Sequence, residues 1–142
     1  MSSWRSQALI EAPLESVWEL VGDPNRYPEW AGTVVSITGL AAIAPGQTYR
    51  QRTRTPDGEM ETTFRIEELD ELHEIKLHCV DSGLWTRWLL TEAQQSTFVD
   101  VEVGVAADDA TDPELRDALN TKSHFRRLTE GSIDGVRAMT ES

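Results

Sequence analysis

The N-terminal part of the chain changes from an alternating pattern to helical spacing. Residues 4–11 largely alternate apolar with polar side chains, a period of two that indicates a β-strand. Residues 12–13 (AP) end it, because proline has no N–H to give to a sheet. Apolar residues three and four apart predict a short helix at residues 14–21. Residues 23–30 (DPNRYPEW) begin with a capping aspartate followed by proline, so we expect a second short helix that ends near Pro28.

The central half of the chain reads as strands separated by turns. Alternation is clearest at residues 60–67 and 98–105, where one face is apolar and the other is polar. One buried and one wetted face is typical of an antiparallel sheet. The predicted strands are residues 33–40, 47–55, 59–69, 73–81, 84–93 and 96–106.

The C-terminal segment predicts one long amphipathic helix. It opens at Asp112 with a cap followed by proline, and its apolar positions continue at helical spacing for about 27 residues. Its inner face holds Phe125 and Lys122, and a buried ammonium must reach the rim, pair with an acid or meet a ligand anion. Gly131 and Gly135 either allow a close approach of the sheet or a ligand, or are tolerated surface glycines. The element order, with many strands beside few helices, indicates an α+β fold.

Length and charge narrow the class of protein. The chain has 142 residues, which predicts a single domain spanning 1–142. Its net charge of −12 opposes binding to nucleic acid and to anionic lipid surfaces. No apolar run is long enough to cross a membrane, and the N-terminus has no signal-peptide pattern. We therefore expect a cytoplasmic protein, monomer or homodimer, with no nucleic-acid partner and no integral membrane segment.

Three arginines alternate along one predicted strand. Arg50, Arg52 and Arg54 share a face, and the expected partners are acids of a neighbouring strand such as Glu61 and Glu67. The sequence thus predicts a solvated sheet face covered by ion pairs.

Several motifs resemble those of a known family. Residues 10–21 (IEAPLESVWELV) resemble the I-x-A-P-x-x-x-V-W-x-L opening of the START-like (SRPBCC) superfamily, in its polyketide cyclase/dehydrase-like branch. Residues 23–30 resemble the D-x-x-x-Y-P-x-W that follows it, and residues 88–99 its late hairpin, with Ser96 where the family usually has glycine. The resemblance implies a helix-grip fold, in which a curved antiparallel seven-stranded sheet wraps around a long C-terminal helix and leaves an apolar cavity. Family members bind lipids, polyketides and other hydrophobic molecules.

With the strand phases that the resemblance implies, one set of side chains faces this cavity. Ile75 and Cys79 complete the lining, and Trp30 is expected near the mouth. The alternative is that the same side chains simply fill a core. The predicted ligand-binding residues are Trp30, Tyr49, Gln51, Thr53, Met60, Thr62, Phe64, Leu77, Thr86, Trp88, Lys122, Phe125 and Thr129.

Little in the sequence points to a catalytic or metal centre. The three histidines have no partners at metal-ligand spacing, and we expect His78 and His124 to face outward. No phosphate loop, dinucleotide fingerprint or nucleophile elbow is present, so no cofactor and no metal are expected.

Three functions therefore remain. The first is a carrier or sensor that binds a small hydrophobic molecule. The second is a polyketide cyclase or aromatase-like enzyme that uses the same cavity, with Tyr49 or Lys122 as acid–base candidates. The third is an interaction protein with a filled cavity.

Overall fold

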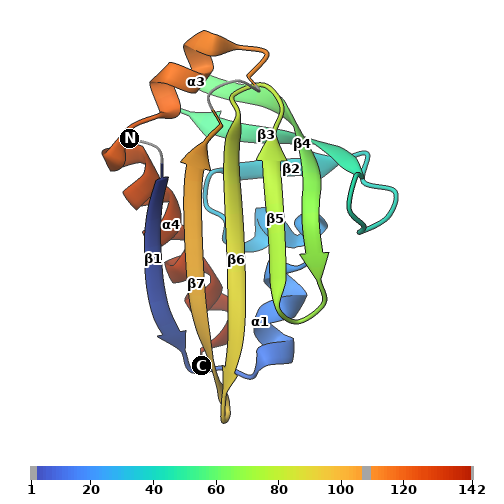
Figure 1. The fold of residues 1–142 in the computed structure, drawn as a ribbon, viewed down its shortest axis with the longest axis vertical. Coiled ribbons are helices and arrows are strands. Elements are labelled where there is room, and N and C mark those ends of the chain that lie inside the picture. The colour runs from blue at the N-terminus through green and yellow to red at the C-terminus, as the bar shows by residue number, and fades with distance from the viewer. Residues whose placement is uncertain (1–2, 107–109, 142) are drawn as a thin grey trace.

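The computed structural model describes residues 3–106 and 110–141, which form a curved sheet against one layer of helices (Figure 1). The sheet is antiparallel and seven-stranded in the order β1-β7-β6-β5-β4-β3-β2. This confirms the α+β helix-grip class, and each predicted strand is present to within a few residues at its ends. The strands are β1 (Ser3–Ile10), β2 (Val34–Thr38), β3 (Thr48–Thr55), β4 (Gly58–Asp70), β5 (Glu74–Cys79), β6 (Leu84–Ala93) and β7 (Ser96–Val105).

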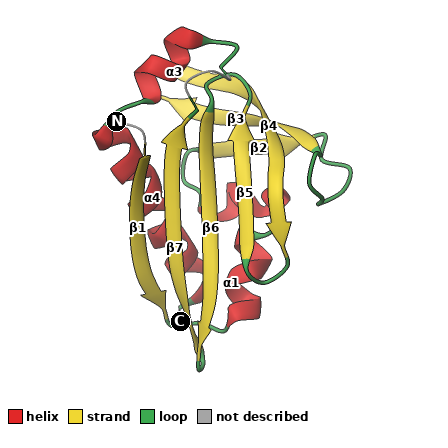
Figure 2. Ribbon diagram, in the orientation of Figure 1, coloured by secondary structure: helices red, strands yellow, loops and turns green. Residues whose placement is uncertain are grey.

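The helices lie on the concave side of the sheet (Figure 2). The long helix passes behind β1 and β7, with α1 near its C-terminal end and α3 at the opposite end of the molecule (Figure 1). The helical segments are α1 (Leu14–Val21), the 3₁₀ turn η1 (Pro24–Arg26), α2 (Tyr27–Trp30), α3 (Pro113–Leu119) and α4 (Lys122–Thr140).

Two helix predictions were wrong in their limits. The C-terminal helix is broken at Asn120, which has φ −83° and ψ 63°, and Thr121 then caps α4 by accepting a hydrogen bond from the His124 N–H at 3.1 Å. A local cap therefore interrupts an apolar pattern that continues across the break. The second short helix does not end at Pro28 but runs to Trp30, because a proline in the first turn removes only an N–H that has no helical partner there.

One end of the concave side is a packed core. Val99, Val101 and Val103 of β7 are fully buried, and they face the apolar sides of α1 and α4. The Thr97 hydroxyl donates to the Ala12 carbonyl at 2.8 Å and so fixes the proline-containing link between β1 and α1. The β6–β7 turn contains Gln94 at φ 62°, so a non-glycine residue takes the left-handed position beside Ser96.

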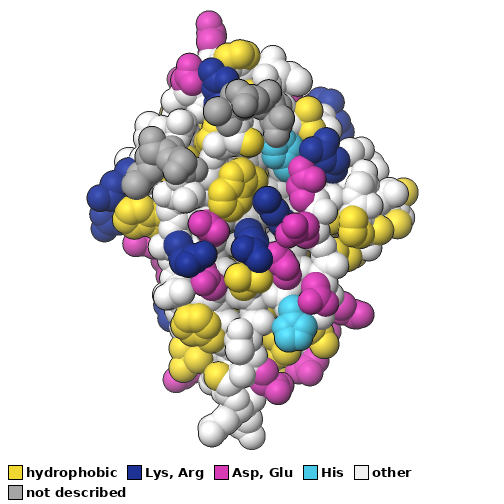
Figure 3. Space-filling model, viewed as in Figure 1, with side chains coloured by type: hydrophobic (Ala, Val, Ile, Leu, Met, Phe, Trp, Pro, Cys, Tyr) yellow, Lys and Arg dark blue, Asp and Glu magenta, His cyan; other side chains and the backbone are white. Residues whose placement is uncertain are grey.

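The convex face of the sheet carries interspersed charges of both signs (Figure 3). Arg50 pairs with Glu61 at 3.0 Å, and Arg52 reaches Glu59 and Glu61 at 3.8 Å each. The predicted pairing is confirmed for these two arginines with Glu61, whereas Glu67 pairs with Arg65 of its own strand, β4, at 2.8 Å. Arg54 has no ion pair with any described residue. None of the described helices is sufficiently long and apolar to span a bilayer.

Candidate functional site

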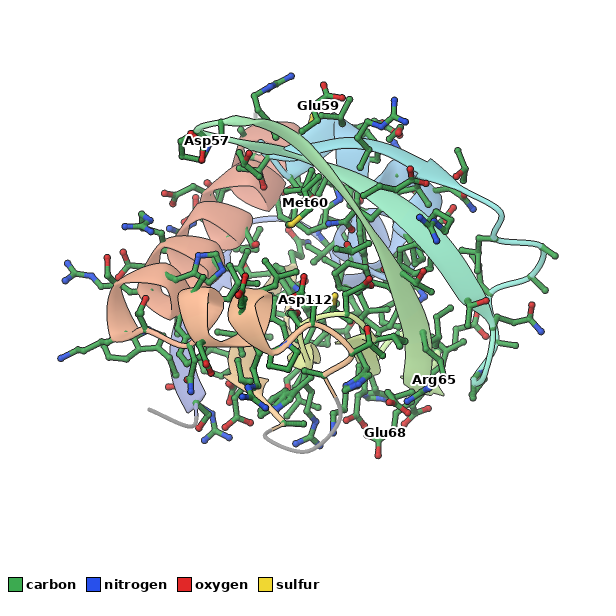
Figure 4. All side chains as sticks on the ribbon, turned by 90° about the horizontal axis from the view of Figure 1, so that it is seen from above. Asp57, Glu59, Met60, Arg65, Glu68 and Asp112 are labelled. Carbon is green, nitrogen blue, oxygen red and sulfur yellow. The ribbon has the colours of Figure 1, made fainter. Side chains whose placement is uncertain are left out.

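A cavity of about 960 Å³ lies between the sheet and the helices, at the end away from the packed core. Strands β3 and β4 form one wall, and α3 with the first half of α4 forms the opposite wall. The segment from Ala31 to Val34, between α2 and β2, closes a third side. Figure 4 looks along this space from above and shows Met60 reaching into it from β4.

The wall on β3 and β4 contains five of the predicted residues. Gln51, Thr53, Met60, Thr62 and Phe64 all line the cavity. Their inward orientation follows from strand alternation, because Gln51 pairs with Thr62 and Thr53 with Met60 across the ladder. All except Thr62 remain partly accessible because they face open space. The Gln51 amide donates to the Thr53 hydroxyl at 3.0 Å, so a polar pair stands within an otherwise apolar wall.

The other predicted residues lie outside the cavity wall. Six of them are buried among neighbouring side chains, and a seventh, Thr86, is half-buried. Trp30 and Trp88, for example, meet edge to face at 5.8 Å in the packed core. The Thr129 hydroxyl bonds to the Phe125 carbonyl and lies 2.7 Å from the Ser6 hydroxyl. The seven are Trp30, Tyr49, Leu77, Thr86, Trp88, Phe125 and Thr129.

Lys122 is placed at the rim of the molecule. It is the first residue of α4, its side chain is exposed, and its Nζ lies 5.3 Å from the centre of the Trp4 ring. Of the outcomes open to a lysine at this position, the structure shows the exposed one, supported by a cation–π contact.

Tyr49 is buried close to the cavity without reaching it. Its ring stacks on Phe64 with centres 5.6 Å apart, and its hydroxyl has no hydrogen-bond partner among the described residues. Burial raises the pKa of the Tyr49 hydroxyl well above its ordinary value. That hydroxyl therefore stays neutral, and Tyr49 does not supply a base to the cavity.

The helical wall contains residues that the sequence analysis missed. His124, Arg127, Leu128 and Gly131 form a stripe at helical spacing along α4, and all four line the cavity. The outward placement expected for His124 was therefore wrong, because β3 and β4 curl over a second side of α4. Burial, and secondarily the Arg127 guanidinium, lower the pKa of His124. The neutral imidazole therefore predominates at neutral pH, where one ring nitrogen can accept a proton and the other can donate a hydrogen bond.

His78 does point to the outward face as expected, but it is buried there and not exposed. Its side chain lies on the convex face between its cross-strand neighbours Arg65 and Trp85, with Nδ1 3.9 Å from the Glu67 carboxylate. Across residues 3–106 and 110–141, no three of the side chains suited to bind a metal ion come together.

Comparisons with known proteins place this geometry in context. The sequence profile of the family described as polyketide cyclase/dehydrase and lipid transport matches residues 1–138. No curated protein sequence matches the chain.

Solved structures agree on the fold. A START superfamily protein from Mycobacterium smegmatis superposes with a TM-score of 0.77 at 13% identity, covering 99% of this chain and 98% of its own. Protein NE0264 from Nitrosomonas europaea gives 0.76 at 10% identity, covering 97% and 93%. The di-domain ARO/CYC protein StfQ of the steffimycin biosynthetic pathway gives 0.73 at 14% identity, and the match covers 99% of this chain but 50% of StfQ. At these identities the likeness establishes the helix-grip architecture alone.

Proposed function

The chain belongs to the polyketide cyclase/dehydrase and lipid transport family, and we propose that it binds one small hydrophobic molecule in the cavity between β3, β4, α3 and α4, as a carrier or sensor. The observation that carries this proposal is the cavity itself. Its volume of about 960 Å³ lies within the range of known small-molecule pockets. Its wall is mainly apolar, and Gln51, Thr53 and Thr62 provide a few directed polar groups. This combination is typical of a site that binds an apolar molecule in a defined orientation.

A bulky side chain at Gly131 should block the cavity. A Cβ placed on Gly131 meets nothing within 4 Å, and the residue lines the cavity, so the ring of a Gly131→Phe variant would extend into the binding space. Titration with the neutral fluorescent probe N-phenyl-1-naphthylamine measures entry into the cavity. We expect Gly131→Phe to weaken binding by at least about 10-fold, equivalent to ~1.4 kcal/mol.

Ala138→Phe is the matched control. Ala138 is exposed on the same helix and does not line the cavity. We expect this variant to bind the probe like the unmodified protein. Equal probe affinity in the Gly131→Phe and unmodified proteins, with circular dichroism showing both folded, would place binding elsewhere and contradict the proposal.

An enzyme of the cyclase or aromatase type is the second candidate, and the observation in its favour is the imidazole of His124 in the cavity wall. A neutral imidazole at that position could move a proton during ring closure of a bound chain. The assay would use a linear poly-β-ketone thioester, with loss of water followed by mass spectrometry. If this candidate holds, His124→Ala removes turnover and leaves the affinity for N-phenyl-1-naphthylamine unchanged, whereas the binding proposal predicts no turnover in either protein.

A further inference from the structure

The arginines of this chain divide into two groups. Nine of them form an ion pair with a carboxylate of the described residues. Only Arg54 and Arg127 have no such partner there, and both line the cavity. A shortage of acids does not explain this, because the chain has 25 acidic and 13 basic residues. Both residues border the same cavity, Arg127 from α4 and Arg54 from the end of β3.

Arg127 lies exposed at the edge of the cavity wall. Its Nη1 donates a hydrogen bond to the Ser123 hydroxyl at 2.8 Å, one turn back along α4. A guanidinium has five N–H donors, so most of them remain available. The neighbouring residues of the stripe are His124 on one side and Leu128 and Gly131 on the other. A charged group therefore adjoins both a second polar group and an apolar surface.

The charges of the wall differ in sign from those of the whole molecule. The wall contains two arginines and, within the described residues, one acid, Asp57, while the chain as a whole carries −12. Asp57 is exposed in the β3–β4 turn, and Figure 4 shows it at the periphery, whereas Met60 projects inward. The cavity wall is thus mainly apolar and carries a small net positive charge, although the protein as a whole is strongly acidic. This arrangement favours a ligand with a negative group.

We propose that the ligand of this cavity is an apolar molecule that carries one acidic group, and that Arg127 binds this group at the rim. The apolar body then lies against Met60, Phe64 and Leu128. Guanidinium groups suit this role because they bind carboxylates and similar anions through paired, charge-assisted hydrogen bonds. This inference rests on the proposed binding function and specifies its ligand class.

Two fluorescent probes that differ by one charged group test it. N-phenyl-1-naphthylamine is neutral, and 8-anilinonaphthalene-1-sulfonate has the same two ring systems with an added sulfonate. We expect Arg127→Gln to weaken binding of the sulfonate probe by about 5- to 10-fold, because a charge-assisted contact is lost. The affinity for the neutral probe should change by less than about 2-fold, since the apolar contacts remain. Added salt should weaken only the sulfonate probe, and less so in Arg127→Gln.

Arg126→Gln is the matched control. Arg126 is the neighbouring residue on α4, it pairs with Glu130 at 3.5 Å, and it does not line the cavity. We expect it to bind both probes like the unmodified protein.

The outcomes separate the inference from the function on which it rests. A protein that does not bind the neutral probe lacks the proposed binding function, and the inference is then lost with it. A protein that binds the neutral probe but loses no affinity for the sulfonate probe on Arg127→Gln overturns the inference alone. Equal losses for both probes would also overturn it, because Arg127 would then act through packing and not through charge.

Discussion

Replacing Gly135 with alanine is expected to lower the free energy of unfolding by about 2–4 kcal/mol. Gly135 lies in the middle of α4, where alanine normally stabilises a helix by about 1 kcal/mol. Here the added Cβ would lie 2.1 Å from the Trp30 carbonyl oxygen, which is a backbone atom and cannot rotate away. The predicted effect therefore has the opposite sign to the helix propensity.

Trp30 cannot easily move aside. Its indole N–H donates to the Leu20 carbonyl at 3.1 Å, and its ring meets Tyr27 and Trp88 edge to face. Any shift of α2 that makes room for the methyl group must disturb these contacts. The same shift would move the segment that begins at Ala31 and forms one side of the cavity. We therefore expect Gly135→Ala to weaken probe binding as well as stability.

Gly131→Ala is the matched control on the same helix. Nothing lies within 4 Å of its added Cβ, so we expect alanine there to stabilise the protein by about 0.5–1 kcal/mol. Urea unfolding followed by tryptophan fluorescence measures both variants. If Gly135→Ala proved as stable as Gly131→Ala, the close contact between α2 and α4 would be refuted.

The two glycines show what sequence periodicity can and cannot predict. Both interrupt an amphipathic pattern, and both could have been tolerated surface residues or points of close approach. The structure gives them different environments, because Gly135 contacts α2 and Gly131 borders open space. The distinction depends on the position of α2, which lies more than a hundred residues earlier in the chain. The sequence pattern around residues 131–135 therefore cannot tell the two glycines apart.

The same limit explains which cavity residues could be predicted. Strand alternation correctly indicates the side of the sheet on which Gln51, Met60 and Leu77 lie. It does not indicate whether the space in front of each side chain is filled. In front of Trp88 that space is occupied by Trp30, whereas in front of Gln51 and Met60 it is open.

The residues of α4 that line the cavity could not be predicted for a related reason. A helical wheel shows one inner face when a helix packs on a flat sheet. This sheet curls, so two sides of α4 face it: Phe125 and Ile133 face the core, while His124 and Gly131 face the cavity. The break at Asn120 also turns α3 into a separate element whose Leu115 and Leu119 reach the cavity. The curvature is a property of the whole sheet, and its effect on α4 could not be derived from the helix sequence.

The Phe125 side chain forms part of the boundary between the core and the cavity. It is fully buried, and it packs in a cluster with Cys79, Leu84 and Val103. Cys79 and Leu84 also line the cavity, so one layer of side chains separates Phe125 from open space. This position links the stability of the fold to the occupancy of the site.

Phe125→Ala is therefore expected to lower the free energy of unfolding by about 3–5 kcal/mol. The loss should lie in the upper part of this range, because neighbouring side chains that already border a void cannot collapse well into the new space. Leu128→Ala is the control: Leu128 is half-buried, lines the cavity and packs against the same cluster, so we expect a loss of about 1–2 kcal/mol. Urea unfolding with and without N-phenyl-1-naphthylamine measures both variants.

Bound ligand should partly restore the weakened protein. A molecule that binds only the folded state stabilises it by about 2.7 kcal/mol at roughly 100 times its Kd, so saturating probe should raise the unfolding midpoint of Phe125→Ala. The enlarged space should also admit a ligand bulkier than the one that the unmodified protein accepts, because the ring of Phe125 no longer fills it. A variant that loses stability as expected but gains none on addition of probe would show that its folded state no longer binds the probe, and would contradict this prediction.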